Sequence, residues 1–249
     1  MLEVIIFTLL TIAYFIGRYM LNKPSYVKIM TAAYITIILA TQLSYNVSLL
    51  SKMCEGNSGF GRALWITLVP WLIIFGGIQA LLMMFPSWLS PFSNTFGYLV
   101  AKLAGVNSLL FKILKTPSTV TGASDNSLKK TIHNIYSDPS LFINEITPAN
   151  FDDFVRSSTF MFVPNAASMP EMMKLRNVIR MKELVSEFIW YLLSGILATT
   201  VSYNTIANSD CTNSVAEMKK RHDEYEQNVK QNAEEEKNAK PQRVYYIRD

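Results

Sequence analysis

Four long apolar stretches constrain this chain more than any other feature of its sequence. They cover residues 2–16, 27–50, 63–85 and 188–206, and few charged residues interrupt them. A helix needs about 20 mostly apolar residues to cross the hydrocarbon core of a bilayer. Half of the 249 residues are hydrophobic and only 17% are charged, which is more apolar than is usual for a soluble domain. We therefore predict an all-α, polytopic membrane protein with about four transmembrane helices.

The first stretch has the length of a signal peptide but not its flanks. Glu3 stands where a cationic residue is typical, and no A-x-A cleavage site follows. We predict a retained span. Lysines and arginines are more frequent in the turn at 18–26 and in the long segment at 86–187 than on the opposite face. Because positive residues favour the cytosolic side, we predict that these two segments are cytosolic and that both termini lie on the other face.

The second and fourth stretches end in similar sequences. ILATQLSYN begins at Ile38, ILATTVSYN begins at Ile196, and each precedes one of the two cysteines, Cys54 and Cys211. The predicted orientation puts both cysteines on the non-cytosolic face, where an oxidising compartment would allow a disulfide; two unrelated free thiols are the alternative. Polar groups at helix ends can hydrogen-bond across helices and anchor rings at the headgroup level. The candidates here are Ser44, Tyr45, Asn46, Ser202, Tyr203 and Asn204.

Inside the third stretch, Pro70 and the pair Gly76–Gly77 predict a kink and close helix packing. Gln42 and Gln79 are the only amides deep in the predicted spans, and no acid or base lies there. A proton or ion path usually needs such groups, so a pump or channel is not favoured.

After the third stretch the chain divides into polar and apolar segments. Residues 1–86 are predicted to form a three-span bundle, and residues 87–168 an interfacial helix with a small helical polar region. The helix at 95–115 is apolar, and Lys102, Ser108, Lys112 and Lys115 lie on one side of it, as expected at a membrane surface. The alternative is a fifth span, which would put the two cysteines on opposite faces.

Residues 169–207 are predicted to form a long stem helix that continues into the fourth span. Ser168 and Glu171 have the spacing of a capping box, Pro170 suits the first turn, and no breaker follows before Gly195. We expect one helix over 169–206, about 55 Å long at 1.5 Å per residue.

Residues 208–249 form a charged helical tail with an aromatic terminus. A stripe at coiled-coil spacing predicts a helix over 215–238 that docks to a partner; a solvated helix is the alternative. The terminal RVYYIRD is β-prone and suits addition to a partner's sheet edge, with disorder as the alternative. The residues predicted to dock are Val215, Met218, His222, Tyr225, Val229, Tyr245 and Tyr246.

Patterns typical of catalysis are absent from the sequence. His133 and His222 lie far apart, there is no C-x-x-C, and Asp152–Asp153 is read as a solvated helix face. We expect no enzyme activity, no catalytic or metal site and no cofactor. The net charge of +4 is small and spread out, so we predict no nucleic-acid partner.

Three phrases resemble membrane proteins of nucleocytoplasmic large DNA viruses, the algal viruses and their giant relatives. They are PFSNTFGYLVAKLAG at 91–105, INEITPANFDDF at 143–154 and SEFIWYLLSGILATTVSYNTIANSDC at 186–211. The resemblance implies a structural role in the virion inner membrane near the minor capsid layer, and an origin in the host endoplasmic reticulum. In such viruses a disulfide could also form on the cytosolic face, because some of them encode thiol oxidation machinery.

Two functions follow as hypotheses. The first is a structural protein that anchors the bilayer to the capsid or minor capsid layer through its stem and tail. Its partners would be lipid and capsid or other virion membrane proteins, and it could form an oligomer. The second is a membrane-remodelling or fusion factor acting in assembly or entry through the interfacial helix.

Overall fold

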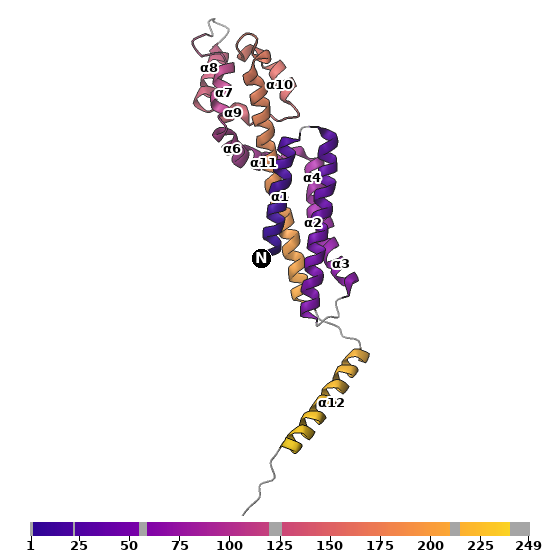
Figure 1. Cartoon of the computed structure of the whole chain (residues 1–249). Helices are drawn as coiled ribbons and strands as arrows, with labels where there is room; N and C mark the ends of the chain where they lie inside the picture. Colours follow the sequence, from indigo (N-terminus) through magenta and orange to yellow (C-terminus); the bar gives the residue numbers. More distant parts are fainter. Residues whose placement is uncertain (1, 22, 55–58, 120–125, 210–214, 240–249) are drawn as a thin grey trace, which may run out of the picture.

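The computed structural model describes residues 2–21, 23–54, 59–119, 126–209 and 215–239. Within these ranges the chain is mostly helical and has no strand beyond one isolated bridge. Figure 1 shows three parts, which we call the bundle, the head and the tail. The bundle consists of α1 (Leu2–Met20), α2 (Pro24–Met53), α3 (Phe60–Pro70), α4 (Gly77–Met84) and the second half of α11 (Pro170–Ala207). The head consists of α5 (Ser90–Phe92), α6 (Tyr98–Leu103), α7 (Val106–Ile113), α8 (Asn126–Ser137), α9 (Ser140–Ile143) and α10 (Phe151–Ser157) on the first half of α11. The tail is α12 (Val215–Ala239).

The bundle confirms the predicted transmembrane helices. Among the described residues, four helical segments are long and apolar enough to cross a membrane, and they contain the four predicted stretches almost entirely. Their outer faces remain apolar: Leu72 is 70% exposed and Ile73 is 69% exposed. Since apolar side chains that face away from the protein are stable in lipid and not in water, this part of the chain is membrane-spanning.

The third span is irregular where the sequence predicted it. Six residues, Trp71–Gly76, form a π-helical segment between Pro70 and Gly77. Proline has no backbone N–H to donate and its ring crowds the preceding turn, so a regular α-helical ladder cannot continue through it. The widened turn joins α3 to α4 as one span.

Aromatic rings from four helices fill the middle of the bundle. Tyr14 of α1 stacks on Tyr34 of α2 with ring centroids 4.3 Å apart, and Tyr191 of α11 lies 5.9 Å from Tyr14. The Tyr34 hydroxyl is 2.9 Å from the Thr11 hydroxyl. The rings are therefore held both by packing and by a hydrogen bond, as buried tyrosines require.

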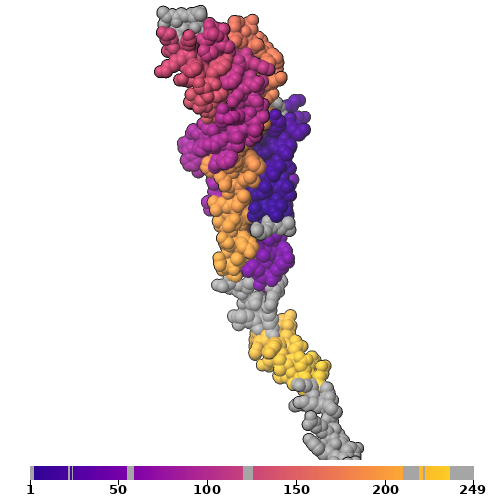
Figure 2. Space-filling model, turned by 90° about the vertical axis from the view of Figure 1, so that its left-hand side faces the viewer, coloured from indigo at the N-terminus to yellow at the C-terminus, as the bar shows by residue number. Residues whose placement is uncertain are grey.

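The head has its own core, which α7 shares with α11. Val106, Leu110 and Ile113 are fully buried against a cluster that includes Leu175 and Ile179 of α11. A backbone pair, Lys115 N–H to the Met161 carbonyl and Val163 N–H to the Ile113 carbonyl, closes the end of this core. Figure 2 shows the head seated on one end of the bundle, where α1 and α11 lie side by side.

The predicted single helix at 95–115 is wrong. The segment Pro86–Leu103 and the helix Val106–Ile113 are bent by 81° at Gly105, whose φ of 83° is a left-handed conformation that suits glycine. The first piece does expose apolar side chains, among them Phe96, Leu99 and Leu103. The second piece turns into the head core, so only the first can lie at a membrane surface.

Helix α11 confirms the predicted long stem. It runs over 38 residues, about 57 Å at 1.5 Å per residue, and Gly195 does not interrupt it. The predicted capping box is wrong, because α11 begins at Pro170 with Met169 as its N-cap, and the Ser168 hydroxyl donates to the Asn165 carbonyl instead.

Helix α12 confirms the predicted tail helix, within one residue at its end. Its described side chains, residues 219–220 and 222–235, are all exposed. Figure 1 shows it beyond the end of the bundle that is opposite to the head. Head and tail therefore lie on different sides of the membrane-spanning part.

The close contact between α1 and α11 gives a direct test of the bundle. A Cβ placed on Gly195 would overlap the Phe7 ring, whereas a Cβ on Gly77 meets no atom within 4 Å. We expect Gly195→Ala to lower the melting temperature of the detergent-solubilised protein, because overpacking costs about 1–3 kcal/mol. Gly77→Ala is the matched control. Equal melting temperatures for the two variants would contradict this packing.

Candidate functional site

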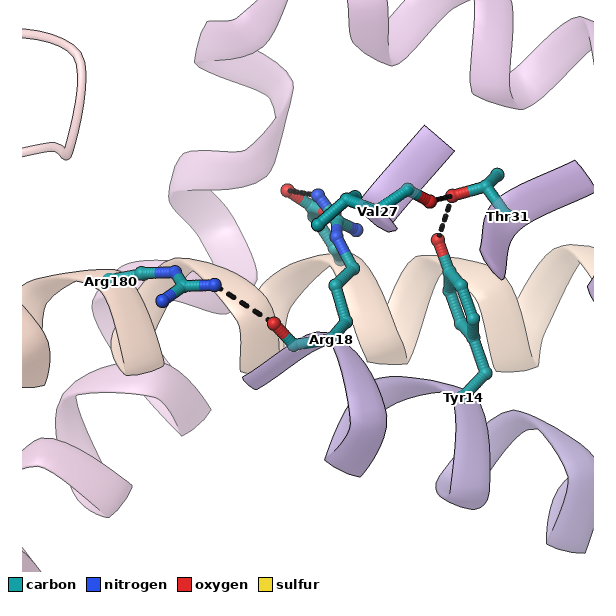
Figure 3. A network of polar contacts seen from close by, with 6 residues as sticks. Tyr14, Arg18, Val27, Thr31 and Arg180 are labelled. Carbon is teal, nitrogen blue, oxygen red and sulfur yellow. Dashed lines mark hydrogen bonds and ion pairs between the residues drawn. The ribbon is translucent and has the colours of Figure 1, made fainter. Parts of the chain in front are cut away.

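Charged side chains from α1, α2 and α11 gather where the head meets the bundle. Arg18, near the end of α1, pairs with Glu187 of α11 through both guanidinium nitrogens, one of them 3.3 Å from a carboxylate oxygen. Arg180, two turns earlier on α11, donates to the backbone carbonyl of Arg18 at 2.8 Å (Figure 3). These contacts fix the end of α1 against the stem half of α11.

A hydrogen-bonded chain extends this group to α2. The Tyr14 hydroxyl lies 2.8 Å from the Thr31 hydroxyl, and Thr31 donates to the Val27 carbonyl at 2.8 Å (Figure 3). Tyr14 is one helical turn below Arg18, so three helices are connected by polar contacts at one level. Arg18 and Glu187 keep about a fifth of their side chains exposed, and Glu187 directly precedes the apolar stretch at 188–206.

A cavity of about 390 Å³ lies beside this pair, and we call it the junction cavity. The end of α1, the first turns of α2, Pro148 of the head and the stem half of α11 line it, and it is open on one side. Its lining residues are Arg18, Val27, Lys28, Pro148, Arg180, Glu183, Leu184 and Glu187. Five of these eight residues carry ionisable groups, so the cavity is suited to a charged ligand.

The Glu183 carboxyl is the perturbed group of the cavity. Burial and the neighbouring Glu187 raise its pKa to about 7, and Lys182 and Arg18 oppose that shift. No hydrogen bond or ion pair to Glu183 exists among the described residues. A carboxyl without a donor in a partly buried place prefers its neutral form.

Lys182 joins the head to the stem, a role that was not predicted from the sequence. Its side chain is 2% exposed and its ammonium donates to the Ile143 carbonyl at 2.9 Å, to Asn94 Oδ1 at 3.1 Å and to Asn144 Oδ1 at 3.5 Å. Burial among neutral acceptors lowers the pKa of Lys182 to about 8. Gly97 approaches the Lys182 backbone so closely that a Cβ there would overlap the Lys182 carbonyl oxygen.

Two more contacts from α11 hold the segment after α4. The Ser186 hydroxyl donates to the Leu89 carbonyl at 2.6 Å, and the Trp190 indole donates to the Trp88 carbonyl at 3.1 Å. They attach the end of the short helix Pro86–Leu89 to α11. The head is thus hydrogen-bonded to α11 on both sides of the charged group.

The two SYN groups lie at the opposite end of the bundle, and each gives one contact between helices. Asn46 Nδ2 donates to Thr67 Oγ1 at 2.8 Å, and the Ser202 hydroxyl donates to the Ile66 carbonyl at 3.0 Å. Both contacts go to α3, so α3 connects the two similar helix ends. Ser44 is exposed and donates within its own helix, Tyr203 and Asn204 are exposed, and Tyr45 is partly buried.

The end of α2 and the end of α11 lie on the same side of the bundle. Leu50 and Cys54 of α2, Ala63 and Ile66 of α3 and Ile206 of α11 form one buried cluster. A fifth span between α4 and α11 would separate these ends, so their shared cluster agrees with the predicted four spans and not with the five-span alternative. Cys54 is disulfide-bonded. Cys211 lies outside the described residues, so its pairing with Cys54 stays a prediction.

The tail residues predicted to dock are uncovered where the structure describes them. Tyr225 is 68% exposed, Val229 is 46% exposed, and His222 is exposed and pairs with Glu226. Val215 and Met218 lie within α12. Tyr245 and Tyr246 lie outside the described residues. Docking therefore stays a prediction, and the ion pair of His222 in the described part of the chain is made within α12 itself.

The acid pair of the head, Asp152 and Asp153, forms two ion pairs. Asp152 pairs with Arg176 of α11, which also lies over the Phe151 ring at 4.6 Å, and Asp153 pairs with Arg156 at 3.4 Å. Asp152 thus joins α10 to the stem. No group of three or more histidine, cysteine or acidic side chains in the described part of the chain could hold a metal ion.

Comparison with known proteins found no matching family, no matching curated protein and no matching solved structure.

The raised pKa of Glu183 predicts how stability depends on pH. Between the ordinary value of 4.5 and about 7, the folded protein holds this proton while the unfolded chain releases it. Stability should therefore fall as pH rises through that window. We expect the melting temperature in detergent to decrease from pH 5 to pH 7.5, and Glu183→Gln to reduce this decrease. A Glu183→Gln protein with the wild-type pH profile would contradict the assignment.

The shared position of the two helix ends predicts the disulfide pairing. A peptide map without reductant should yield Cys54 linked to Cys211, because the ends of α2 and α11 meet in one cluster. In Cys54→Ser, the thiol of Cys211 should react with maleimide without reductant. Free alkylation of both thiols in the wild-type protein would contradict the pairing.

Proposed function

We propose that this protein is a structural membrane protein that connects a bilayer to protein layers on its two sides. The observation that carries the proposal is the placement of the head and the tail at opposite ends of a membrane-spanning bundle (Figure 1). A protein that only filled a membrane would need neither part. The finer proposal, based on the resemblance of residues 91–105, 143–154 and 186–211, is a location in the inner membrane of a large DNA virus particle.

The rigidity of α11 supports this role. Its first half is packed in the head core and its second half in the bundle core, and no proline follows Pro170 within it. Helices bend sharply at prolines, Gly/Ser pairs, π-bulges or inserted groups. The one such pair in α11, Ser194–Gly195, lies in the bundle half, so none lies between the head and the bundle. A force on the head would therefore be transmitted to the bundle through α11, with no hinge between them.

The tail supports the second attachment. The stripe that contains Tyr225 and Val229 has coiled-coil spacing, and these two side chains are exposed. The ion pairs Lys220–Glu224 and Lys230–Glu226 lie along the helix itself and leave the stripe open. A helix of a capsid or membrane protein, or of a second copy, would cover it. The aromatic terminus would add to that contact.

A second candidate function is membrane remodelling, and one observation favours it. The segment between Pro86 and Leu103 exposes Trp88, Phe96, Leu99 and Leu103 at the level where α4 leaves the membrane. Amphipathic segments at this depth can bend a bilayer by inserting between headgroups. This segment is shorter than the helix expected over 95–115, so the remodelling function has less support than the anchor.

Cross-linking mass spectrometry on intact particles tests the anchor. Lys219, Lys220 and Lys230 report on the tail, and Lys129 and Lys130 of α8 report on the head, all of them exposed. We expect the tail to link to capsid or minor capsid proteins and the head to link to a different set, because the membrane separates them. Links from both to one soluble protein would contradict the two-sided arrangement. Absence of the protein from particles would favour remodelling.

Two double variants test whether the cross-links of the tail depend on the apolar stripe of α12. Tyr225→Ser with Val229→Ser should abolish the tail links, since it removes the apolar contact. Gln227→Ser with Gln231→Ser changes another face of the same helix and should preserve them. Equal loss in both pairs would assign the links to the helix in general and not to the stripe.

A further inference from the structure

The junction cavity lies where the polar headgroups of a bilayer would be. Arg18 is two residues from the end of α1, and Glu187 directly precedes the apolar stretch at 188–206. Lys28 lies in the first turns of α2. The cavity therefore lies at the edge of the hydrocarbon core, on the side of the head.

The internal contacts use only part of the charge in this cavity. Arg18 and Glu187 neutralise each other. Arg180 uses one of its five N–H groups, in the bond to the Arg18 carbonyl. Lys28 and Glu183 have no hydrogen bond or ion pair within the described part of the chain. Two cationic groups and one carboxyl thus remain for a ligand.

We propose that the junction cavity binds the headgroup of a phospholipid that ends in a primary amine. Its phosphate is held by Lys28 and Arg180, and its ammonium donates to Glu183, because a cation beside this carboxyl favours the carboxylate form. Guanidinium groups bind phosphate oxygens through paired hydrogen bonds, and a carboxylate needs an N–H donor, which choline lacks. A purely anionic headgroup would leave Glu183 without a cation. This inference does not depend on the proposed anchor function.

A neighbouring cavity favours a lipid over a soluble phosphate. It has a volume of about 280 Å³, shares Leu184 with the junction cavity and lies between α1 and α11. Its lining extends from Tyr19 and Met181 on the side of the head to Ile12 and Phe188 deeper in the bundle, and it is almost entirely apolar. Such a groove suits an acyl chain attached to a headgroup.

Native mass spectrometry of the full chain in detergent tests the proposal. Equal amounts of phosphatidylethanolamine, phosphatidylcholine and phosphatidylglycerol are added, and the lipid retained is identified. We expect wild type to retain phosphatidylethanolamine preferentially. Glu183→Gln should reduce the preference over phosphatidylcholine about tenfold, because one charge-assisted hydrogen bond is lost. Lys28→Gln should weaken retention of all three lipids.

Lys52→Gln is the matched control, since it removes an exposed lysine from the other end of α2. It should leave retention unchanged, and the melting temperature of each variant shows that it is folded. Equal retention of phosphatidylethanolamine and phosphatidylcholine by wild type would overturn the proposal. The same profile in Glu183→Gln as in wild type would overturn the role of Glu183.

A soluble competitor distinguishes a lipid headgroup from a free phosphate ester as the ligand of the junction cavity. Phosphoethanolamine carries the phosphate and the amine without acyl chains. We expect it to displace the bound lipid only at a much higher concentration than phosphatidylethanolamine itself, because the apolar groove adds affinity for the chain. Displacement at equal concentration would overturn the lipid as the ligand and assign the cavity to a soluble phosphate ester.

Discussion

The rest of the structure depends on α11, which contributes side chains to the core of the head and to the core of the bundle. Leu175 and Ile179 of α11 are fully buried in the head, while Tyr191 and Ala198 are buried in the bundle. Elements of both parts pack on α11. A helix propagates its axis as long as its backbone hydrogen bonds continue, so the position of the head relative to the membrane follows from the packing of the bundle. The two parts therefore act as one body, although each has its own core.

The continuity of α11 places charged residues in buried surroundings where the head meets the bundle. Lys182 is buried among neutral acceptors, and its lowered pKa shows that its charge is poorly solvated there. Glu183, the next residue, is also shifted toward its neutral form. Apolar residues of similar size would often be no less stable at such a place. Lys182 fixes the orientation of the head relative to α11. Its ammonium reaches Asn94, Ile143 and Asn144 only when the head is in one position.

The sequence predicts the membrane spans well because hydrophobic length is a local property. It fails at the helix expected over 95–115, since the same apolar residues suit either lipid or a protein core, and only packing decides between them. It misses Lys182 because its partners Asn94 and Ile143 lie far away along the chain. Of the six candidate residues in the SYN groups, Asn46 and Ser202 make hydrogen bonds between helices in the described part of the chain. Three successive helical residues are spread over about 200°, so they cannot all face one neighbour.

The tail follows a different physical rule from the rest of the chain. Bundle and head are held by burial, whereas the described side chains of α12 are exposed and its internal ion pairs are solvated pairs of weak effect. Most helical stability in proteins comes from packing an apolar face, and this helix has such a face in Tyr225 and Val229 without a cover from its own chain. We therefore expect α12 to become more stable as a helix when another helix covers that stripe. Under the proposed docking, the tail is the part of the chain that depends on a partner, whereas bundle and head bury their apolar residues within the chain.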